Sequence, residues 1–121
     1  MTKEQRQAVR ELEDKLKETD GPAPDGMLWD TLVKFQSYPF HTAKNLEFFY
    51  IIKGNEMFVT RKDKSITRAS VMVAFHKALE LNRVVTGPKK LGTFGASYLY
   101  PVFREIGVIV ENCADKKLYQ V

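Results

Sequence analysis

The sequence has few of the side chains that catalysis or metal binding requires. It contains two histidines, His41 and His76, and one cysteine, Cys113. Metal sites need several His, Cys or acidic ligands at close spacing, and nucleophilic catalysis needs a serine or cysteine beside a base. His41, next to an expected strand, is the one candidate for a general base, and no nucleophile motif accompanies it. We therefore expect a protein that is not an enzyme and that holds no metal or cofactor.

One glycine-containing loop has the spacing of a phosphate-binding loop but lacks its chemistry. Residues 87–93 read Gly-Pro-Lys-Lys-Leu-Gly-Thr, so the two glycines stand as they do in a Walker A loop. That loop continues with a lysine and a Ser or Thr, which contact the β- and γ-phosphates and the magnesium ion. Here Thr93 and Phe94 occupy those positions. The sequence therefore excludes a nucleotide hydrolase of this class.

Positive charge is concentrated in about one third of the chain. The net charge is +4, yet residues 53–91 alone hold nine basic and three acidic side chains, a difference of +6. Neutralising phosphates with Lys and Arg releases condensed counterions, so such a segment favours nucleic-acid binding. A solvated basic face without a partner is the alternative. The basic residues are Lys53, Arg61, Lys62, Lys64, Arg68, Lys77, Arg83, Lys89 and Lys90.

The first twenty residues predict an amphipathic helix. Thr2 and Gln5 have the spacing of a capping box, and the apolar residues that follow form a narrow stripe at helical spacing. The stripe consists of Ala8, Val9, Leu12 and Leu16. Such a helix either packs lightly on the domain or pairs with a second copy. Because residues 21–24 read Gly-Pro-Ala-Pro, we divide the chain into this helix (1–20) and a globular domain (25–121).

The clearest strand pattern is a hairpin over residues 48–61, with a two-residue turn at Gly54-Asn55. If Lys53 faces Glu56, one face carries Phe48, Tyr50, Ile52, Met57 and Val59, and the other carries Phe49, Ile51 and Phe58. Both faces are apolar, so either both are covered or one is a partner surface. Residues 38–42 predict an additional short edge strand.

Three more helices are expected within the globular domain. They cover Met27–Gln36 with Asp25 as its N-cap, about Thr67–Asn82, and about Ser97–Ile106 with Pro101 in its first turn. Residues 108–110 predict a last strand. The pattern as a whole predicts a small α+β domain in which the hairpin packs against about three helices, with the N-terminal amphipathic helix added.

Residues 65–95 resemble the recognition helix and wing of GntR-like winged helix-turn-helix regulators. The features shared are a polar turn, a Thr-Arg pair at Thr67-Arg68, an Ala-Leu pair at Ala78-Leu79, a Val-Val pair, and a basic loop ending in Gly-Thr-Phe. The resemblance implies a winged-helix fold whose third helix enters the major groove. It requires a preceding helix, which only residues 56–64 could supply, so strand and helix both stay open there.

These observations lead us to expect a DNA-binding protein, a small transcriptional regulator that contacts phosphate of double-stranded DNA through a basic helix and loop. Thr67, Arg68 and Ser70 lie in the first helical turn, where such proteins contact base edges. The expected DNA contacts are Lys62, Lys64, Thr67, Arg68, Ser70, Lys77, Lys89 and Lys90. The alternative is a non-enzymatic protein–protein interaction module, a homodimer through the N-terminal helix or the hairpin. An enzyme or ligand-binding domain around His41 ranks last.

The composition also bears on where the protein acts. No apolar run approaches the roughly 20 residues of a membrane span, and the N-terminal residues are too polar for a secretory signal. The single cysteine fits a reducing compartment. We therefore expect a cytoplasmic protein without a membrane partner.

Overall fold

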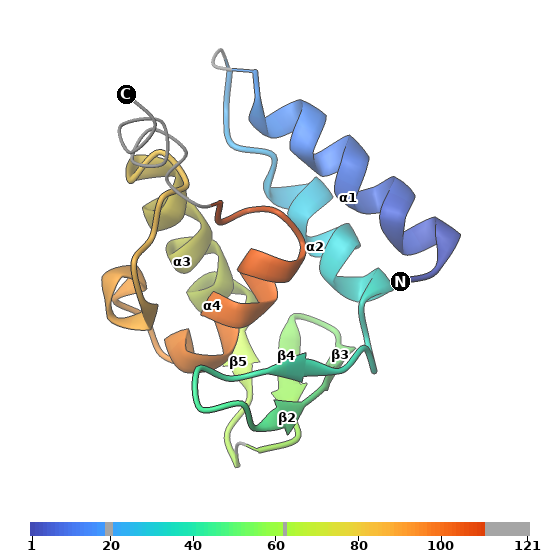
Figure 1. Cartoon of the computed structure of the whole chain (residues 1–121), viewed down its shortest axis with the longest axis vertical. Helices are drawn as coiled ribbons and strands as arrows, with labels where there is room; N and C mark the ends of the chain where they lie inside the picture. Colours follow the sequence, from blue (N-terminus) through green and yellow to red (C-terminus); the bar gives the residue numbers. More distant parts are fainter. Residues whose placement is uncertain (19–20, 62, 111–121) are drawn as a thin grey trace, which may run out of the picture.

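The fold was obtained as a computed structural model, which describes residues 1–18, 21–61 and 63–110. Lys62 and Cys113 lie outside this part. Helices and antiparallel strands are both present, which confirms the small α+β domain (Figure 1). The elements are α1 (Lys3–Leu16), α2 (Asp25–Lys34), β1 (Phe40–His41), β2 (Glu47–Phe48), β3 (Tyr50–Lys53), β4 (Glu56–Val59), β5 (Ile66–Thr67), α3 (Arg68–Glu80), the 3-10 helix η1 (Pro88–Leu91) and α4 (Ala96–Glu105). No helix in the described ranges is long and apolar enough to cross a membrane.

The N-terminal helix begins at the predicted capping box and lies along α2. The Gln5 amide N–H donates to the Thr2 hydroxyl at 3.1 Å, and the Gln5 side chain accepts from the Thr2 N–H at 2.8 Å. The Gln5 side chain also donates to the Lys34 carbonyl at 2.9 Å, so the start of α1 is held at the end of α2 and the two helices run antiparallel (Figure 1). Ala8 and Leu12 are buried. In this structure the apolar stripe therefore packs on the domain.

Helix α2 is shifted from its expected position. It begins at Asp25 and ends at Lys34, with Pro24 at the N-cap position and no side-chain cap. Asp25 is thus the first helical residue instead of the cap. Its carboxylate lies 2.8 Å from Nε2 of His76 on α3, an ion pair that the sequence pattern did not indicate.

Two antiparallel sheets hold the strands. In the smaller one Phe40 pairs with Phe48, which confirms the edge strand expected over residues 38–42. The larger sheet has the order β3-β4-β5, with Lys53 opposite Glu56 as predicted. Residues 56–59 are therefore a strand, and this settles the alternative that the sequence left open for the first part of 56–64.

The edge of β3 that faces away from β4 is hydrogen-bonded to the chain segment that follows α2. The Ser37 N–H donates to the Tyr50 carbonyl at 2.9 Å, and the Ile52 N–H donates to the Gln36 side-chain oxygen at 2.7 Å. Ser37 reaches this position with a left-handed φ of 66°. Strand β3 is thus hydrogen-bonded on both sides.

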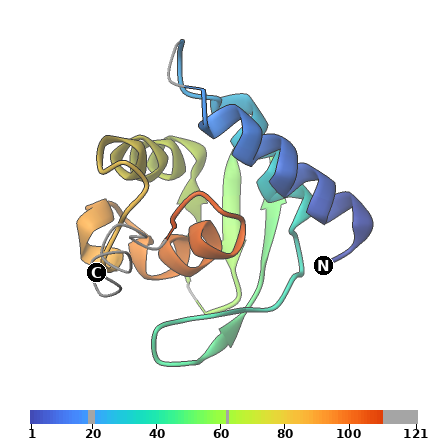
Figure 2. The same ribbon diagram turned by 45° about the horizontal axis from the view of Figure 1, so that its top comes forward.

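The core lies between the larger sheet and the helices; Figure 1 shows the helices above the strands, and Figure 2 shows them beside and in front of the strands. Alternation along the strands directs one set of side chains into this core. The Tyr50 hydroxyl donates to the buried Leu32 carbonyl at 2.6 Å, and burial raises the pKa of this phenol well above its ordinary value. The largest buried side chains include Leu28, Phe35, Phe48, Tyr50, Met57, Ile66, Phe75, Leu99 and Phe103.

The winged-helix arrangement is not confirmed. Helix α3 directly follows β5, so strands stand where the helix before a recognition helix is required. Pro88 begins the 3-10 helix η1 in the segment expected to form the wing hairpin, and no described residue between 87 and 95 is in a strand. The wing expectation was wrong because proline and a left-handed Gly92 close a helical turn in this segment.

The chain after α4 also differs from expectation. Pro101 lies in the interior of α4, not in its first turn. Residues 108–110 form a turn instead of a strand: the Ile109 N–H donates to the Phe103 carbonyl at 3.1 Å, and the Val110 N–H donates to the Arg83 carbonyl at 2.9 Å. The Arg83 guanidinium in turn donates to the carbonyls of residues 107 and 108. These contacts occupy the backbone groups that a strand would pair.

Candidate functional site

The most distinctive surface of the molecule is the outer face of the β3–β4 hairpin. Phe49, Ile51 and Phe58 are exposed by 43%, 38% and 39%, whereas their inward-facing neighbours are buried. Scattered exposed apolar residues are ordinary, but adjacent ones mark interaction sites. We call the surface formed by Phe49, Ile51, Lys53, Glu56, Phe58 and Thr60 the outer sheet face.

Strand register brings the apolar residues of the outer sheet face together. Ile51 lies directly opposite Phe58. Phe49 lies one step further along, where its N–H donates to the Thr60 hydroxyl at 3.1 Å and its carbonyl accepts from the Thr60 N–H at 3.0 Å. Phe49 and Phe58 are therefore diagonal neighbours, and such positions are about 7–8 Å apart on an antiparallel pair.

Cationic side chains stand at both ends of this face. The Lys53 ammonium lies 6.0 Å from the centre of the Phe58 ring, at the turn end of the hairpin. Arg61 lies at the other end, where its Nε donates to the Glu47 carbonyl at 2.8 Å and its own carbonyl accepts from Tyr98 at 3.3 Å. Lys64, in the loop to β5, is exposed. An aromatic surface with positive charge at each end favours an anionic, planar ligand.

One carboxylate opposes this charge. Glu56 lies on the outer sheet face opposite Lys53, and its side chain accepts a hydrogen bond of 2.5 Å from the Ser65 hydroxyl. The contact holds the carboxylate beside β5. It also leaves a negative charge on an otherwise positive surface.

The basic residues of segment 53–91 are not neutralised by neighbours. The ion pairs within the described residues join Lys15 to Glu18, Lys17 to Glu13, His41 to Glu47 and His76 to Asp25. No lysine or arginine between residues 53 and 91 belongs to such a pair in the described part of the chain. Lys53, Lys64, Lys77, Lys89 and Lys90 are exposed, so their charges are available to a partner, whereas Arg68 and Arg83 are engaged within the domain.

The residues expected to read base edges have structural roles instead. Thr67 caps α3, accepting from the Ser70 N–H at 3.2 Å and donating to the Ser70 hydroxyl at 3.1 Å. The half-buried Arg68 lies 5.1 Å above the ring of the buried Trp29 and donates to the Asn55 side chain at 3.4 Å. These contacts join α3, α2 and the hairpin turn, so the three side chains are engaged within the domain.

The remaining expected contacts lie apart from one another, one near the sheet and the others on α3 and η1. Lys64 lies near the sheet, whereas Lys77 is on α3, nine residues beyond Arg68 and roughly 13 Å further along the helix axis. Lys89 and Lys90 are exposed on η1, which packs against α3 and α4 and lies across the molecule from β3 in both views (Figures 1 and 2). Lys62 lies outside the described residues.

The sequence-based list of DNA contacts omitted Phe49, Phe58, Lys53 and Arg61. The signal for them was present, because the alternation of the hairpin had already assigned Phe49 and Phe58 to one face. It did not show which of the two apolar faces the helices leave uncovered. That information comes only from the packing.

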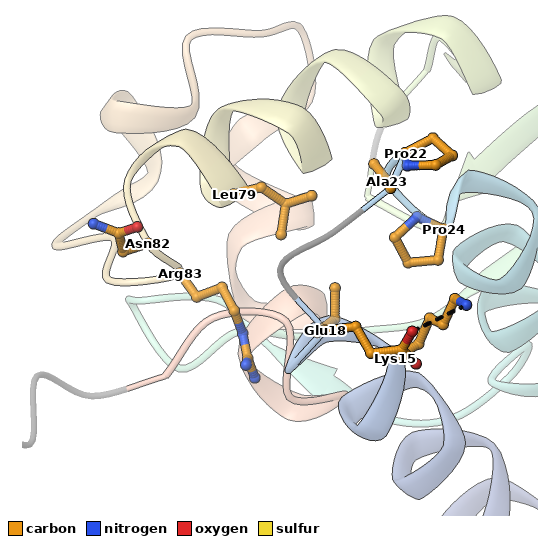
Figure 3. Close-up of a pocket in the computed structure, with 10 residues that line it drawn as sticks. Lys15, Glu18, Pro22, Ala23, Pro24, Leu79, Asn82 and Arg83 are labelled. Atoms are coloured by element: carbon orange, nitrogen blue, oxygen red, sulfur yellow. Dashed lines mark hydrogen bonds and ion pairs between the residues drawn. The ribbon is translucent and has the colours of Figure 1, made fainter.

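Other hollows carry less chemistry. A hollow of about 400 Å³ lies between the end of α1, residues 21–24 and the end of α3 (Figure 3). Its Lys15 is paired with Glu18 at 3.5 Å, and the guanidinium of its Arg83 is bound to backbone carbonyls. The charged side chains that line it are therefore already engaged.

The surroundings of His41 are open. His41 lies 3.9 Å from Glu47 and borders a shallow hollow with Pro101, Arg104 and Glu105. Glu105 accepts a hydrogen bond from Tyr38 at 2.9 Å; this bond, with burial and the negative charge, raises the pKa of the Tyr38 phenol. The described residues contain no group of three or more His, Cys, Asp or Glu able to hold a metal ion.

Comparison of the chain with family models, with curated proteins and with solved structures found no match.

Proposed function

We propose that this protein binds nucleic acid, and that the basic residues around the outer sheet face contact the phosphates. The observation that carries the proposal is the unpaired charge: segment 53–91 has a difference of +6, and no lysine or arginine in its described part forms an ion pair with a described residue. Phosphate binding by such side chains breaks no internal ion pair, so the counterions released contribute fully to affinity.

The net charge near the hairpin is positive, as phosphate binding requires, even when the acidic residues are counted. Between residues 53 and 68 there are five basic and two acidic side chains. Lys53, Arg61 and Lys64 are exposed, so their ammonium and guanidinium groups can adjust to a phosphate backbone. Phosphate contacts position a nucleic acid without reading its sequence. The proposal therefore specifies where binding occurs, and leaves sequence preference to be measured.

A charge-reversal experiment tests this function. The sheet variant changes Lys53, Arg61 and Lys64 to Glu; the control variant makes the same change at Lys3, Arg6 and Arg10, which are exposed on α1. Anisotropy titrations of labelled DNA at low and moderate salt should show salt-sensitive binding by the wild type. The sheet variant should bind at least about tenfold more weakly, because several phosphate contacts are lost, and the control should lose clearly less.

Two results would contradict the proposal. One is an absence of binding by the wild-type protein even at low salt. The other is an equal loss in both variants, which would reflect total charge without a localised surface. Circular dichroism of each variant confirms that the fold is retained.

The exposed residues Phe49, Ile51 and Phe58 also favour a second candidate, a protein–protein interaction module that pairs two copies of the chain. Apolar sheet faces of this kind are common in homodimers. Light scattering during the same study separates the two functions: a concentration-dependent dimer mass with no DNA binding would support the module.

A further inference from the structure

We infer that the outer sheet face binds a single strand of nucleic acid, whose unpaired bases stack on Phe49 and Phe58. This inference rests on the proposed function and narrows its ligand. It differs from the expectation drawn from the sequence, in which helix α3 reads a duplex.

Helix α3 does not offer the side chains that a duplex reader needs. Thr67 and Ser70 are hydrogen-bonded to each other, and Arg68 lies between Trp29 and Asn55. The residues that α3 does expose near its start are Ala69 and Val73, which carry no hydrogen-bonding group for a base edge. Direct readout in the major groove relies on such groups.

The distance between the positions of Phe49 and Phe58 fits bases that are not stacked on each other. Positions such as Phe49 and Phe58 are about 7–8 Å apart, roughly twice the 3.4 Å rise of stacked bases. Each ring can accept one base only if the strand is extended between them. The faces of bases in a duplex are covered by their neighbours, so a single strand is the form that offers them.

The charges fit the path of such a strand. Lys53 lies beside Phe58 at 6.0 Å, and Arg61 follows Thr60, the residue opposite Phe49. The Phe58 ring therefore has a cation close to it, whereas Arg61 lies at the Phe49 end of the face with its Nε donating to the Glu47 carbonyl. Aromatic side chains flanked by positive charge are the common arrangement of proteins that bind single strands without a sequence requirement.

The β3 edge of the larger sheet argues against an extended peptide that adds there. A peptide that adds to a sheet needs free backbone groups on an edge strand. On β3 the Tyr50 carbonyl and the Ile52 N–H are already bonded to Ser37 and Gln36. A ligand on the outer sheet face therefore contacts the side chains of β3 and not its backbone, as stacking on bases requires.

The test compares three labelled probes, an oligothymidine of about 20 nucleotides, an oligouridine of equal length and a random duplex. One variant changes Phe49 and Phe58 to Ala. A second changes both to Leu, which keeps apolar area and removes the ring. Val73→Ala on α3 is the control. We expect the single strands to bind more tightly than the duplex, and both phenylalanine variants to bind them at least about fivefold more weakly, with the control unchanged.

The outcomes separate this inference from the proposed function. If nothing binds any probe, the proposed function fails and the inference with it. If the duplex binds more tightly, or the Ala or Leu variant binds a single strand like the wild type while charge reversal still weakens binding, only the inference fails. A dimer that forms without nucleic acid and is lost in the Ala variant would assign the face to a second copy. Tighter binding of either the thymidine or the uridine strand than of the duplex supports the inference.

Discussion

The two faces of one hairpin have similar composition and opposite surroundings. Tyr50, Met57 and Val59 point inward and are exposed by 0%, 0% and 4%. Phe49 and Phe58, each adjacent in sequence to one of them, point outward and are about two-fifths exposed. Both faces carry large apolar side chains, although the outer face also carries Lys53, Glu56 and Thr60. The difference lies in the helices, which cover one face only.

This comparison separates residues that hold the fold from residues available to a partner. Burial of the inner face is what stabilises the sheet, since an isolated hairpin is marginal in water. The outer face contributes less burial and yet keeps two phenylalanines. Apolar residues clustered without being covered are costly for solubility and are usually explained by binding.

Changing Met57 to Ala should lower the free energy of unfolding by about 2–5 kcal/mol, because the buried side chain leaves a cavity. Changing Phe58 to Ala on the opposite face should cost less, about 1–2 kcal/mol, since two-fifths of this residue is already exposed and its removal leaves no closed cavity. Urea denaturation of the two variants measures both values. An equally large loss for Phe58 would mean that the outer face is covered, and the comparison would break down.

Changing Tyr50 to Phe should cost about 1–2 kcal/mol, because the Leu32 carbonyl loses its buried donor. The same change should reduce sensitivity to alkali. Burial raises the pKa of Tyr50 above the ordinary value of 10.0, so its contribution to stability is complete below that pH and declines as the pH rises further. Thermal unfolding between neutral and strongly alkaline pH checks this, and an unchanged alkaline decline in the variant would refute it.

Changing Glu56 to Gln should strengthen nucleic-acid binding by roughly two- to threefold at low salt, the smallest of these effects. The amide can still accept from Ser65 but no longer repels phosphate. Exposed charges are screened by salt, so the gain should fade at higher ionic strength. Glu4→Gln on α1 changes the total charge equally and serves as the control in anisotropy titrations. An equal gain in both variants would show that Glu56 has no local effect.

Much of the fold was predictable where the determining contacts are local. The Thr2–Gln5 capping box and the pairing of Lys53 with Glu56 both depend on residues close in sequence, and the structure confirms them. The prediction of a strand over residues 108–110 was wrong, because their backbone is hydrogen-bonded to Arg83 and to the end of α4. The alternation of apolar residues in the sequence does not show such contacts. The predicted wing hairpin is absent from the described residues 87–95, because Pro88 begins a helical turn.

The candidate site was predictable only in part. The basic segment was found by counting basic and acidic residues along the sequence, which requires no knowledge of the fold. The internal contacts of Thr67 and Arg68 were not predicted as such, because the sequence does not show that Trp29 and Asn55 lie beside Arg68. Phe49 and Phe58 were assigned to one face correctly, but whether that face is covered depends on where the helices pack.

The Gln36 and Ser37 bonds to β3 have a consequence for behaviour at high concentration. An uncovered sheet face with phenylalanines invites aggregation most strongly when the adjoining edge strand is free to extend the sheet into another molecule. By occupying the Tyr50 carbonyl and the Ile52 N–H, the residues after α2 remove that template. The chain can therefore keep an apolar face open to a ligand without offering β3 as a starting point for a fibril.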